Sequence, residues 1–267
     1  MHFGTALRLL RLDTGLSLRD MARIVGVSSA YLSRVEHGHD PAPTPDRLVS
    51  IARALDLPPH LLLELADQTS PLVSSYMSRV PAAASLFLDI ARRDLPYAEV
   101  SRLRALVDRE FPRGRASERR KVSLRRLLTP ERLVLGLVCS GMDDVVEIAA
   151  GRFGLSGAEA RAVASKILAR EQEAPSLLGS GVALPHALGS HMPSAAALVT
   201  LARPLRVPAP DREPVRLAVV IAGPSSARSI ELLAQVARLA GRGLAGELCD
   251  LGSADRVLAR LEVLESW

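Results

Sequence analysis

The sequence contains few cysteines, few aromatic residues and no long apolar run. Of its 267 residues, two are cysteines and 3% are aromatic. Cys139 and Cys249 are too few for a disulfide framework and are not spaced as a metal site, so we expect both to pack in a core. No apolar run approaches the roughly 20 residues that span a bilayer, and the N-terminal stretch lacks the order of regions found in signal peptides. The sequence therefore predicts a folded cytoplasmic protein that does not insert into membranes.

Apolar residues and arginine are what the sequence has in quantity. Apolar residues make up 48% of the chain, enough for the core of one large domain or two ordinary ones. The net charge of +5 comes mainly from arginine, and the basic excess lies in residues 67–128, with thirteen basic against seven acidic side chains. The densest part is RGRASERRKVSLRR, residues 113–126. This run is either a solvated linker or a linker that also contacts nucleic-acid phosphates.

Turn residues divide the chain into three sections. Residues 1–66 contain five short helical patterns, and residues 67–127 contain two or three more before the basic run ends. In residues 128–267, helical patterns such as MDDVVEIAAGRF alternate with the strand-like runs AAALVTLA and VRLAVVIAG. We therefore expect a multidomain chain with an all-α domain, a helical connector and an α/β domain in which helices flank a mixed sheet.

The first section carries two helical patterns in GLSLRDMARIVGVSSAYLSRVEHG, residues 15–38. Ser17 and Ser28 are suited to cap the two helices, and Gly26 can adopt the left-handed conformation that ends the first. The apolar seam expected between the helices consists of Leu18, Met21, Ala22, Ile24, Val27, Leu32 and Val35. Over about residues 4–65 the chain resembles the Xre, or lambda-repressor-like, helix-turn-helix family, through its Leu-Arg-x-x-Ala, Gly-Val-Ser, Tyr-Leu-Ser-Arg and Glu-x-Gly pattern. The resemblance implies that the second helix enters the major groove of double-stranded DNA.

Seven residues of this section are candidates for DNA contact: Ser17, Arg19, Ser28, Ser29, Ala30, Tyr31 and Arg34. Base contacts are expected from residues 29–31, and phosphate or base contacts from Ser17, Arg19 and Arg34. Glu36 is expected to make an ion pair within the domain instead. The alternative is a helical bundle used only for protein contact.

One helix-turn-helix unit covers only a short half-site, so we expect a homodimer. A stripe of apolar residues at helical spacing, within residues 97–111, is a place for two chains to meet. It consists of Leu103, Leu106, Val107 and Phe111. The same stripe is equally suited to pack back on its own chain.

The α/β section contains an unusual stretch, GSGVALPHAL, residues 179–188. Pro185 has no N–H to donate, so we expect the strand to stop there and His186 to face a cleft. One nitrogen of a neutral imidazole can act as a nucleophile while the other is held by a hydrogen-bond acceptor. A lone histidine after a strand is nevertheless more often structural.

From about Leu128 to Leu261 the chain resembles the enzyme IIA domains of the fructose/mannitol/nitrogen class of the sugar phosphotransferase system. The resemblance rests on LLTPERLVLGL, on the two helices that end in GRFG and AREQE, on GSGVALPHAL and on IELLAQVARLAG. It implies that His186 accepts a phosphoryl group from a phosphocarrier protein, and that Arg170 and Glu171 help to hold that group.

The chain departs from that family at three places. Ser229 stands where a second histidine is common; its hydroxyl can bond a phosphoryl oxygen but supplies no positive charge. Pro175 and Ser176 replace a Ser-Thr pair, and His191 is a weak substitute for the second histidine. No His/Asp/Glu cluster has metal-ligand spacing, so neither a metal nor another cofactor is expected.

Together these features predict a transcriptional regulator whose DNA binding is controlled through phosphorylation of His186. We do not expect an enzyme; at most, the chain accepts or carries a phosphoryl group. Two alternatives stay open. In one, the chain is a phosphotransferase protein whose helix-turn-helix section recruits a partner. In the other, the chain is a regulator whose IIA-like domain only dimerises or binds a ligand.

Overall fold

The computed structural model describes residues 3–67, 71–111, 122–207 and 211–265. The chain forms two compact units, one of Met1–Gln68 with Val122–Trp267 and one of Thr69–Lys121. In the described part of the chain, no helix is long and apolar enough to cross a membrane.

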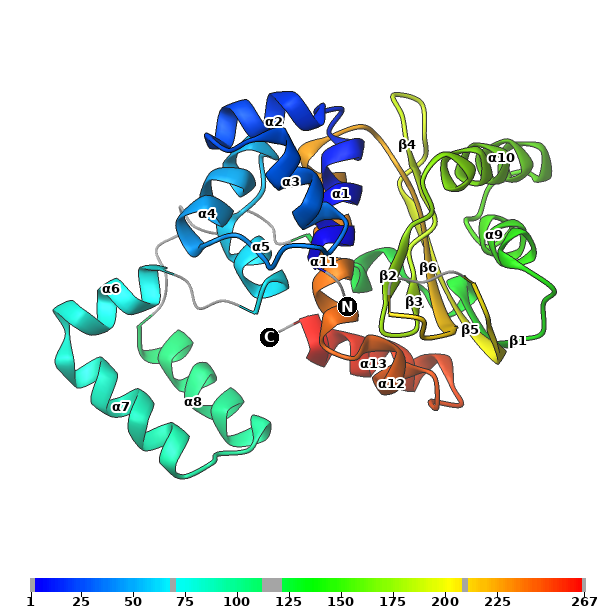
Figure 1. The fold of residues 1–267 in the computed structure, drawn as a ribbon. Coiled ribbons are helices and arrows are strands. Elements are labelled where there is room, and N and C mark those ends of the chain that lie inside the picture. Colours follow the sequence, from blue (N-terminus) through cyan, green and yellow to red (C-terminus); the bar gives the residue numbers. More distant parts are fainter. Residues whose placement is uncertain (1–2, 68–70, 112–121, 208–210, 266–267) are drawn as a thin grey trace. The chain divides into compact units, whose positions relative to one another are not determined.

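The N-terminal part consists of short helices (Figure 1). The described residues 3–67 form five, the number that the turn pattern predicts. They are α1 (Phe3–Asp13), α2 (Leu18–Val25), α3 (Ser29–Glu36), α4 (Pro45–Ala54) and α5 (Pro59–Leu65). Both α4 and α5 begin at a proline. Proline is well tolerated there, because an N–H in the first turn has no acceptor within the helix.

The predicted caps of α2 and α3 are confirmed. Ser17 Oγ accepts from the N–H of Asp20 at 3.1 Å, and Ser28 Oγ accepts from the N–H of Tyr31 at 3.1 Å. Gly26 ends α2 with a φ of 74°, in the left-handed region. The predicted seam is wrong at Ile24, which is 54% exposed. The stripe at i, i+3, i+4 and i+7 from Leu18 includes Val25 instead, which leaves Ile24 on the outer side.

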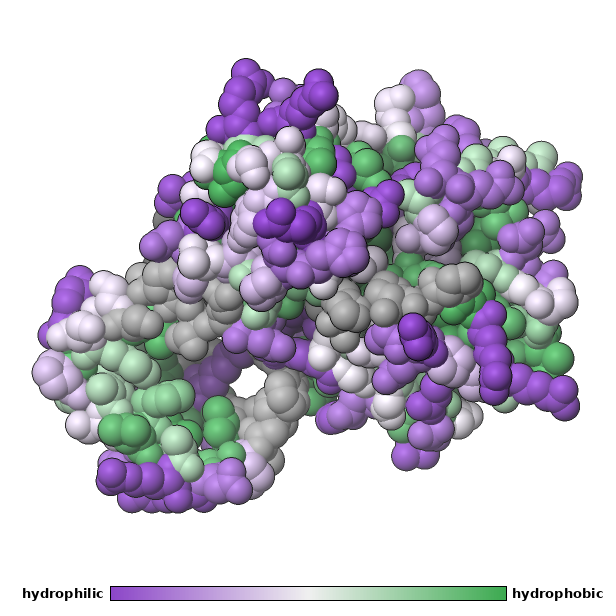
Figure 2. Space-filling view, in the orientation of Figure 1, coloured by the Kyte–Doolittle hydropathy of each residue, from purple (hydrophilic) through white to green (hydrophobic). Residues whose placement is uncertain are grey.

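The described part of the connector contains three helices, α6 (Pro71–Arg79), α7 (Pro81–Arg92) and α8 (Tyr97–Glu110), divided at Pro81 and Pro96. Its predicted apolar stripe is exposed: Leu106 is 45% exposed and Phe111 is 75% exposed. Figure 2 shows apolar side chains gathered on the surface of this unit. Residues 113–121 of the basic run lie outside the described residues.

The α/β domain contains the expected mixed sheet. Its strands are β1 (Leu133–Leu137), β2 (Leu177–Gly179), β3 (Val182–Ala183), β4 (His186–Leu188), β5 (Ala195–Leu205) and β6 (Val215–Gly223). The order is β1-β5-β6-β3-β2, and β4 also pairs with β6. The β1–β5, β3–β6 and β4–β6 pairs are parallel, while β5–β6 and β2–β3 are antiparallel. The strand-like runs of the sequence are β5 and β6.

Helices cover both faces of this sheet (Figure 1). They are α9 (Met142–Ala150), α10 (Gly157–Glu173), α11 (Ala227–Gly241), α12 (Leu244–Leu248) and α13 (Ala254–Glu265), with 3-10 turns η2 (Arg125–Leu127) and η3 (Pro130–Arg132) before β1. Ser156 and Glu159 form a capping box at the start of α10. The chain enters the domain against α13, where Glu265 accepts hydrogen bonds from Ser123 Oγ and the N–H of Leu124, at 2.5 and 2.6 Å.

Successive residues of β6 alternate between two cores, as the two-residue period of a strand requires. Ala218, Val220 and Ala222 pack with α9 and α10. Leu217, Val219 and Ile221 pack with α11 and α13, and this second core continues into the N-terminal helices. Helices α1 and α5 both contact α11, and α1 also contacts β2. The N-terminal helices therefore lie on the sheet face opposite α9 and α10.

Candidate functional site

His186 lies at the start of β4, directly after Pro185. The prediction that the strand stops at Pro185 is only half right. The carbonyl of Pro185 accepts from the N–H of Ile221 at 3.0 Å, and β4 then continues the pairing with β6. Proline removes a donor but leaves an acceptor, so the ladder is interrupted for two residues and resumes. The expectation that His186 faces a cleft is wrong as well, because His186 is 0% exposed.

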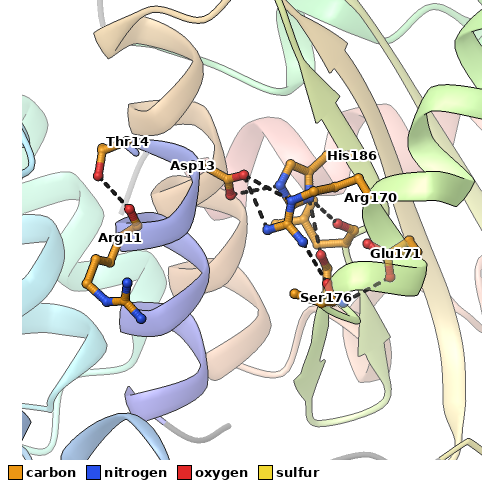
Figure 3. Close-up of polar contacts among 9 residues, drawn as sticks. Arg11, Asp13, Thr14, Arg170, Glu171, Ser176 and His186 are labelled. Atoms are coloured by element: carbon orange, nitrogen blue, oxygen red, sulfur yellow. Dashed lines mark hydrogen bonds and ion pairs between the residues drawn. The ribbon is translucent and has the colours of Figure 1, made fainter. Parts of the chain in front are cut away.

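The two ring nitrogens of His186 have different partners (Figure 3). Nδ1 lies 2.8 Å from the carbonyl oxygen of Leu184 and 3.3 Å from Ser176 Oγ. A carbonyl oxygen only accepts, so Nδ1 carries a proton and donates it to Leu184. Nε2 lies 2.8 Å from Oδ2 of Asp13, and a carboxylate oxygen likewise only accepts, so Nε2 can act as a nucleophile only when Asp13 has moved away.

Asp13 is the last residue of α1, and its side chain is 7% exposed. Its Oδ1 accepts from both Nε and Nη2 of Arg170, each at 3.3 Å, while its Oδ2 faces His186. Arg170, near the end of α10, also donates from Nη1 to the carbonyl of Ala174 at 2.7 Å. Arg170 and His186, which the sequence assigned to one phosphoryl site, therefore bind the same carboxylate (Figure 3).

Glu171 lies beside this pair and holds the loop that follows α10. Its Oε2 accepts from the N–H of Ser176 at 2.9 Å, and Ser176 in turn contacts His186. Burial raises the pKa of Glu171 above its ordinary value, against the opposing effects of Ser176, His186 and Arg170. Among the described residues, Oε1 of Glu171 is buried and has no hydrogen-bond partner.

Ser229 lies in the first turn of α11 and is bonded to residues that precede the helix. Its Oγ donates to the carbonyl of Pro224 at 2.6 Å and lies 3.1 Å from Ser226 Oγ. The hydrogen bonds found in the described residues do not join it to His186, so its role at the acceptor stays a prediction. His191 is exposed and lines an open cavity of about 750 Å³ together with Lys166 and Arg170.

The predicted DNA-contacting residues lie along α2 and α3 and at their starts. Ser17, Arg19, Ser28, Ala30 and Arg34 are exposed, whereas Ser29 and Tyr31 are half-buried. The guanidinium carbon of Arg47, which the sequence did not single out, lies 5.7 Å from the centre of the Tyr31 ring. The contacts of these residues with DNA stay predictions.

Two ion pairs hold charged residues of this region in place. Arg34 donates from Nη2 to Oδ2 of Asp40 at 2.9 Å, and this hydrogen bond raises the pKa of Arg34. The expected internal ion pair of Glu36 is confirmed: its Oε2 accepts from Nη2 of Arg11 at 2.8 Å, and both residues are buried. Glu36 therefore ties α3 to α1.

Two known families match separate parts of the chain. The family described as "Helix-turn-helix domain" matches residues 2–65. The family described as "Phosphoenolpyruvate-dependent sugar phosphotransferase system, EIIA 2" matches residues 126–258. The chain joins a helix-turn-helix domain to an EIIA 2 domain. This pairing of domains is that of a DNA-binding regulator with an EIIA-like module.

Individual relatives cover one domain or the other. The HTH-type transcriptional repressor RghR of Bacillus subtilis (strain 168) is 39% identical over 56 residues, 21% of this chain. The chain spans 42% of that curated relative. The nitrogen regulatory protein IIA-Ntr of Neisseria meningitidis is 26% identical, with a TM-score of 0.44 over 52% of this chain and 98% of its own. IIA mannitol of Escherichia coli is 18% identical, with a TM-score of 0.42 over 50% of this chain and 98% of its own.

Sequence reasoning missed the residues that join the two domains. Asp13 of the helix-turn-helix domain meets His186 and Arg170 of the EIIA domain. Glu64 at the end of α5 accepts from Nη1 of Arg238 at 3.1 Å and from Nη2 of Arg242 at 3.2 Å, both on α11. Neither carboxylate stands in a recognisable motif, so the sequence held no signal for these contacts.

The two cysteines are half-buried, and their thiols are expected to be unreactive. Burial raises the pKa of both thiols, which keeps them protonated and weakly nucleophilic. Cys249 also donates from Sγ to the carbonyl of Arg216 at 3.5 Å. Cys139 and Cys249 each pack against one of the two cores, as expected.

Proposed function

We propose that this chain is a transcriptional regulator of the Xre type whose binding to operator DNA is controlled by phosphorylation of His186. The observation that carries the proposal is the contact of the histidine with the other domain. Nε2 of His186 lies 2.8 Å from a carboxylate of the helix-turn-helix domain. A chemical change at Nε2 therefore acts directly on the position of the DNA-binding domain.

The environment of His186 suits a phosphoryl acceptor. Because Nδ1 donates to Leu184, the ring is oriented and Nε2 can present a lone pair once its present partner has moved. In the transfer, Nε2 forms a bond to phosphorus, the bond from phosphorus to the donor atom of a phosphocarrier protein breaks, and its electron pair stays on the carrier. Arg170 offers a planar set of donors to the phosphoryl oxygens, and Ser229, in the first turn of α11, is a further candidate donor.

The phosphoryl group adds roughly −1.5 to −2 charges to a site where the carboxylate of Asp13 already faces Nε2. Such a change is large enough to reorganise the contact between the domains. The basic run 113–126, at the end of the helical connector, is a further candidate partner for the added charge.

The DNA-binding half of the proposal rests on the exposed side chains of α2 and α3 and on the family of the domain. We propose that the N-terminal part of α3 contacts base edges and that Arg19 and Arg34 contact phosphates, in the cytoplasm where the chromosome lies. A homodimer would present two such helices, and the exposed apolar stripe of α8 supports self-association.

Mapping of bound DNA across the genome tests the proposal. Full-length wild type is compared with His186→Ala and with His191→Ala, a control that removes an exposed histidine five residues away. Growth on carbon sources that charge or discharge phosphocarrier proteins should change the occupancy of wild type and of the control at specific operators, and should leave that of His186→Ala unchanged. His186→Gln, checked by thermal melting, guards against loss of folding in the alanine variant.

Two results would overturn the proposal. Equal responses of wild type and both His186 variants would exclude phosphorylation as the switch. Absence of any preferred genomic sequence would leave a phosphotransfer protein whose helix-turn-helix section binds a protein partner.

A further inference from the structure

The carboxylate of Asp13 occupies the place that a phosphoryl group on His186 needs. Oδ2 lies 2.8 Å from Nε2, and Oδ1 accepts two hydrogen bonds from Arg170. Like a phosphoryl group, the carboxylate is an anion that presents oxygen acceptors to a guanidinium. A phosphorus atom bonded to Nε2 would lie closer to the ring than Oδ2 does, so the two groups exclude each other sterically.

The position of Asp13 in α1 is unfavourable for a carboxylate unless a partner lies outside the helix. Asp13 is the last residue of α1, where the helix dipole places partial negative charge. A cation is favoured at such a position, and an anion is disfavoured. His186 and Arg170, 173 and 157 residues away along the chain, supply the compensating groups.

We infer that Asp13 is an internal competitor of the phosphoryl group, so that phosphorylation of His186 and docking of α1 on the EIIA domain are mutually exclusive. This inference rests on the proposed function and adds its mechanism. Phosphorylation expels a carboxylate of the DNA-binding domain, and the docked DNA-binding domain shields Nε2 from phosphoryl donors.

Because of the remaining contacts between the domains, the protein exchanges between two states, one with α1 docked on the EIIA domain and one with α1 released. Asp13 is carried by α1, which is tied to α3 by the buried Arg11–Glu36 ion pair and which packs on α11 and β2. A rigid helix end cannot make room for a phosphoryl group without loss of its contacts to the site. Glu64 and the shared apolar core hold the docked state, so release of Asp13 must also strain or break these contacts.

Because the two events share one equilibrium, the effect is reciprocal. While the docked state predominates, a change that weakens docking must increase access to His186 by the same factor by which it raises the ratio of undocked to docked protein. The loss of the Asp13 contacts is expected to raise the rate of phosphorylation about tenfold, the factor that corresponds to about 1.4 kcal/mol.

The test is the rate at which full-length protein is phosphorylated by phosphoramidate, a small donor that needs no protein docking. In the reaction Nε2 binds phosphorus, the P–N bond of the donor breaks, and ammonia leaves. Wild type is compared with Asp13→Asn and Asp13→Ala. The control is Asp56→Asn, which removes an exposed carboxylate of the same domain at a φ of 54° that asparagine tolerates. His186→Ala reports labelling of other residues, and thermal melting confirms that each variant is folded.

The expected result is about tenfold faster labelling of both Asp13 variants, with Asp56→Asn equal to wild type and no labelling of the His186 variant. Equal rates in wild type and the folded Asp13 variants would overturn the competition and leave the proposed acceptor standing. Absence of His186-dependent labelling in every variant, with phosphoramidate and with a charged phosphocarrier protein, would overturn the acceptor and the competition together.

Discussion

Glu64 offers a test of how burial sets the strength of the contact between the domains. One of its carboxylate oxygens, Oε2, accepts from Arg238 at 3.1 Å and from Arg242 at 3.2 Å. The two distances are nearly equal, but the side chain of Arg238 is 4% exposed and that of Arg242 is 41% exposed. The same acceptor therefore meets one buried and one solvated guanidinium.

The expected free energies of interaction differ accordingly. A hydrogen bond to a charged group contributes about 1.5–3 kcal/mol, and the 30% exposure of Glu64 places its pair with Arg238 near the lower end of that range. Water screens the pair with Arg242, which is expected to contribute about 0.5 kcal/mol or less. Removal of the Arg238 pair should lower the melting temperature by about 3–6 °C, at roughly 2–4 °C for each kcal/mol in a chain of this size.

Double-mutant cycles with Glu64→Ala measure both interactions on the same background. One cycle adds Arg238→Ala and the other adds Arg242→Ala, and urea unfolding supplies the free energy of unfolding of each variant. We expect a coupling of about 1.5 kcal/mol for the buried pair and at most about 0.5 kcal/mol for the exposed pair. Equal couplings, or a stronger coupling to Arg242, would refute the argument from burial.

Four further outcomes are expected. Burial raises the pKa of Glu171, so the contribution of this residue to stability is present at low pH and is lost as the pH rises through that raised value above 4.5. Glu171→Gln should therefore flatten the fall in the free energy of unfolding between pH 5 and 8, measured by urea titrations. An unchanged slope of unfolding free energy against pH would contradict this. A Cβ at Gly4 would collide with the backbone of α3, so Gly4→Ala should lower the free energy of unfolding by about 1–3 kcal/mol. Gly246 in α12 has open space around it, so Gly246→Ala should leave that free energy unchanged or raise it by up to about 1 kcal/mol in the same assay. Leu106→Glu, on the exposed stripe of α8, should convert a dimer to a monomer in sedimentation experiments, and an unchanged mass would exclude that face. Arg19→Ala should weaken operator binding and reduce the slope of log affinity against log salt by about 1, and an unchanged slope would remove Arg19 from the phosphate contacts.

Several features of the structure were predictable because they depend on residues that are near in sequence. Ser17, Gly26 and Ser28 mark helix ends through hydrogen bonds and backbone conformations that involve only a few neighbours. The apolar runs of β5 and β6 and the prolines of the connector predict their elements for the same reason. The two domain families follow from such local patterns, so the sequence alone indicated a DNA-binding domain joined to a phosphotransferase domain.

The two errors, at Ile24 and at Pro185, have different causes. Ile24 is apolar and close to the helical stripe, but Val25 completes the stripe and Ile24 lies outside it. Pro185 was expected to end a strand because it lacks an N–H. Its carbonyl still pairs with Ile221, and the strand continues because β6 offers partners on both sides of the break. The helical period decided the exposure of Ile24, whereas the partner strand β6 decided the continuation beyond Pro185.

By itself, the sequence indicated most of the segments that form helices and strands, and it singled out His186 as the candidate phosphoryl acceptor. Only the tertiary structure decided that this histidine is covered and that a carboxylate 173 residues away covers it. The physical reason is that Asp13 and His186 are joined neither by helical spacing nor by strand pairing. Their contact forms only after α1 has packed on α11 and β2, and that packing depends on two complete apolar surfaces, which no short motif records.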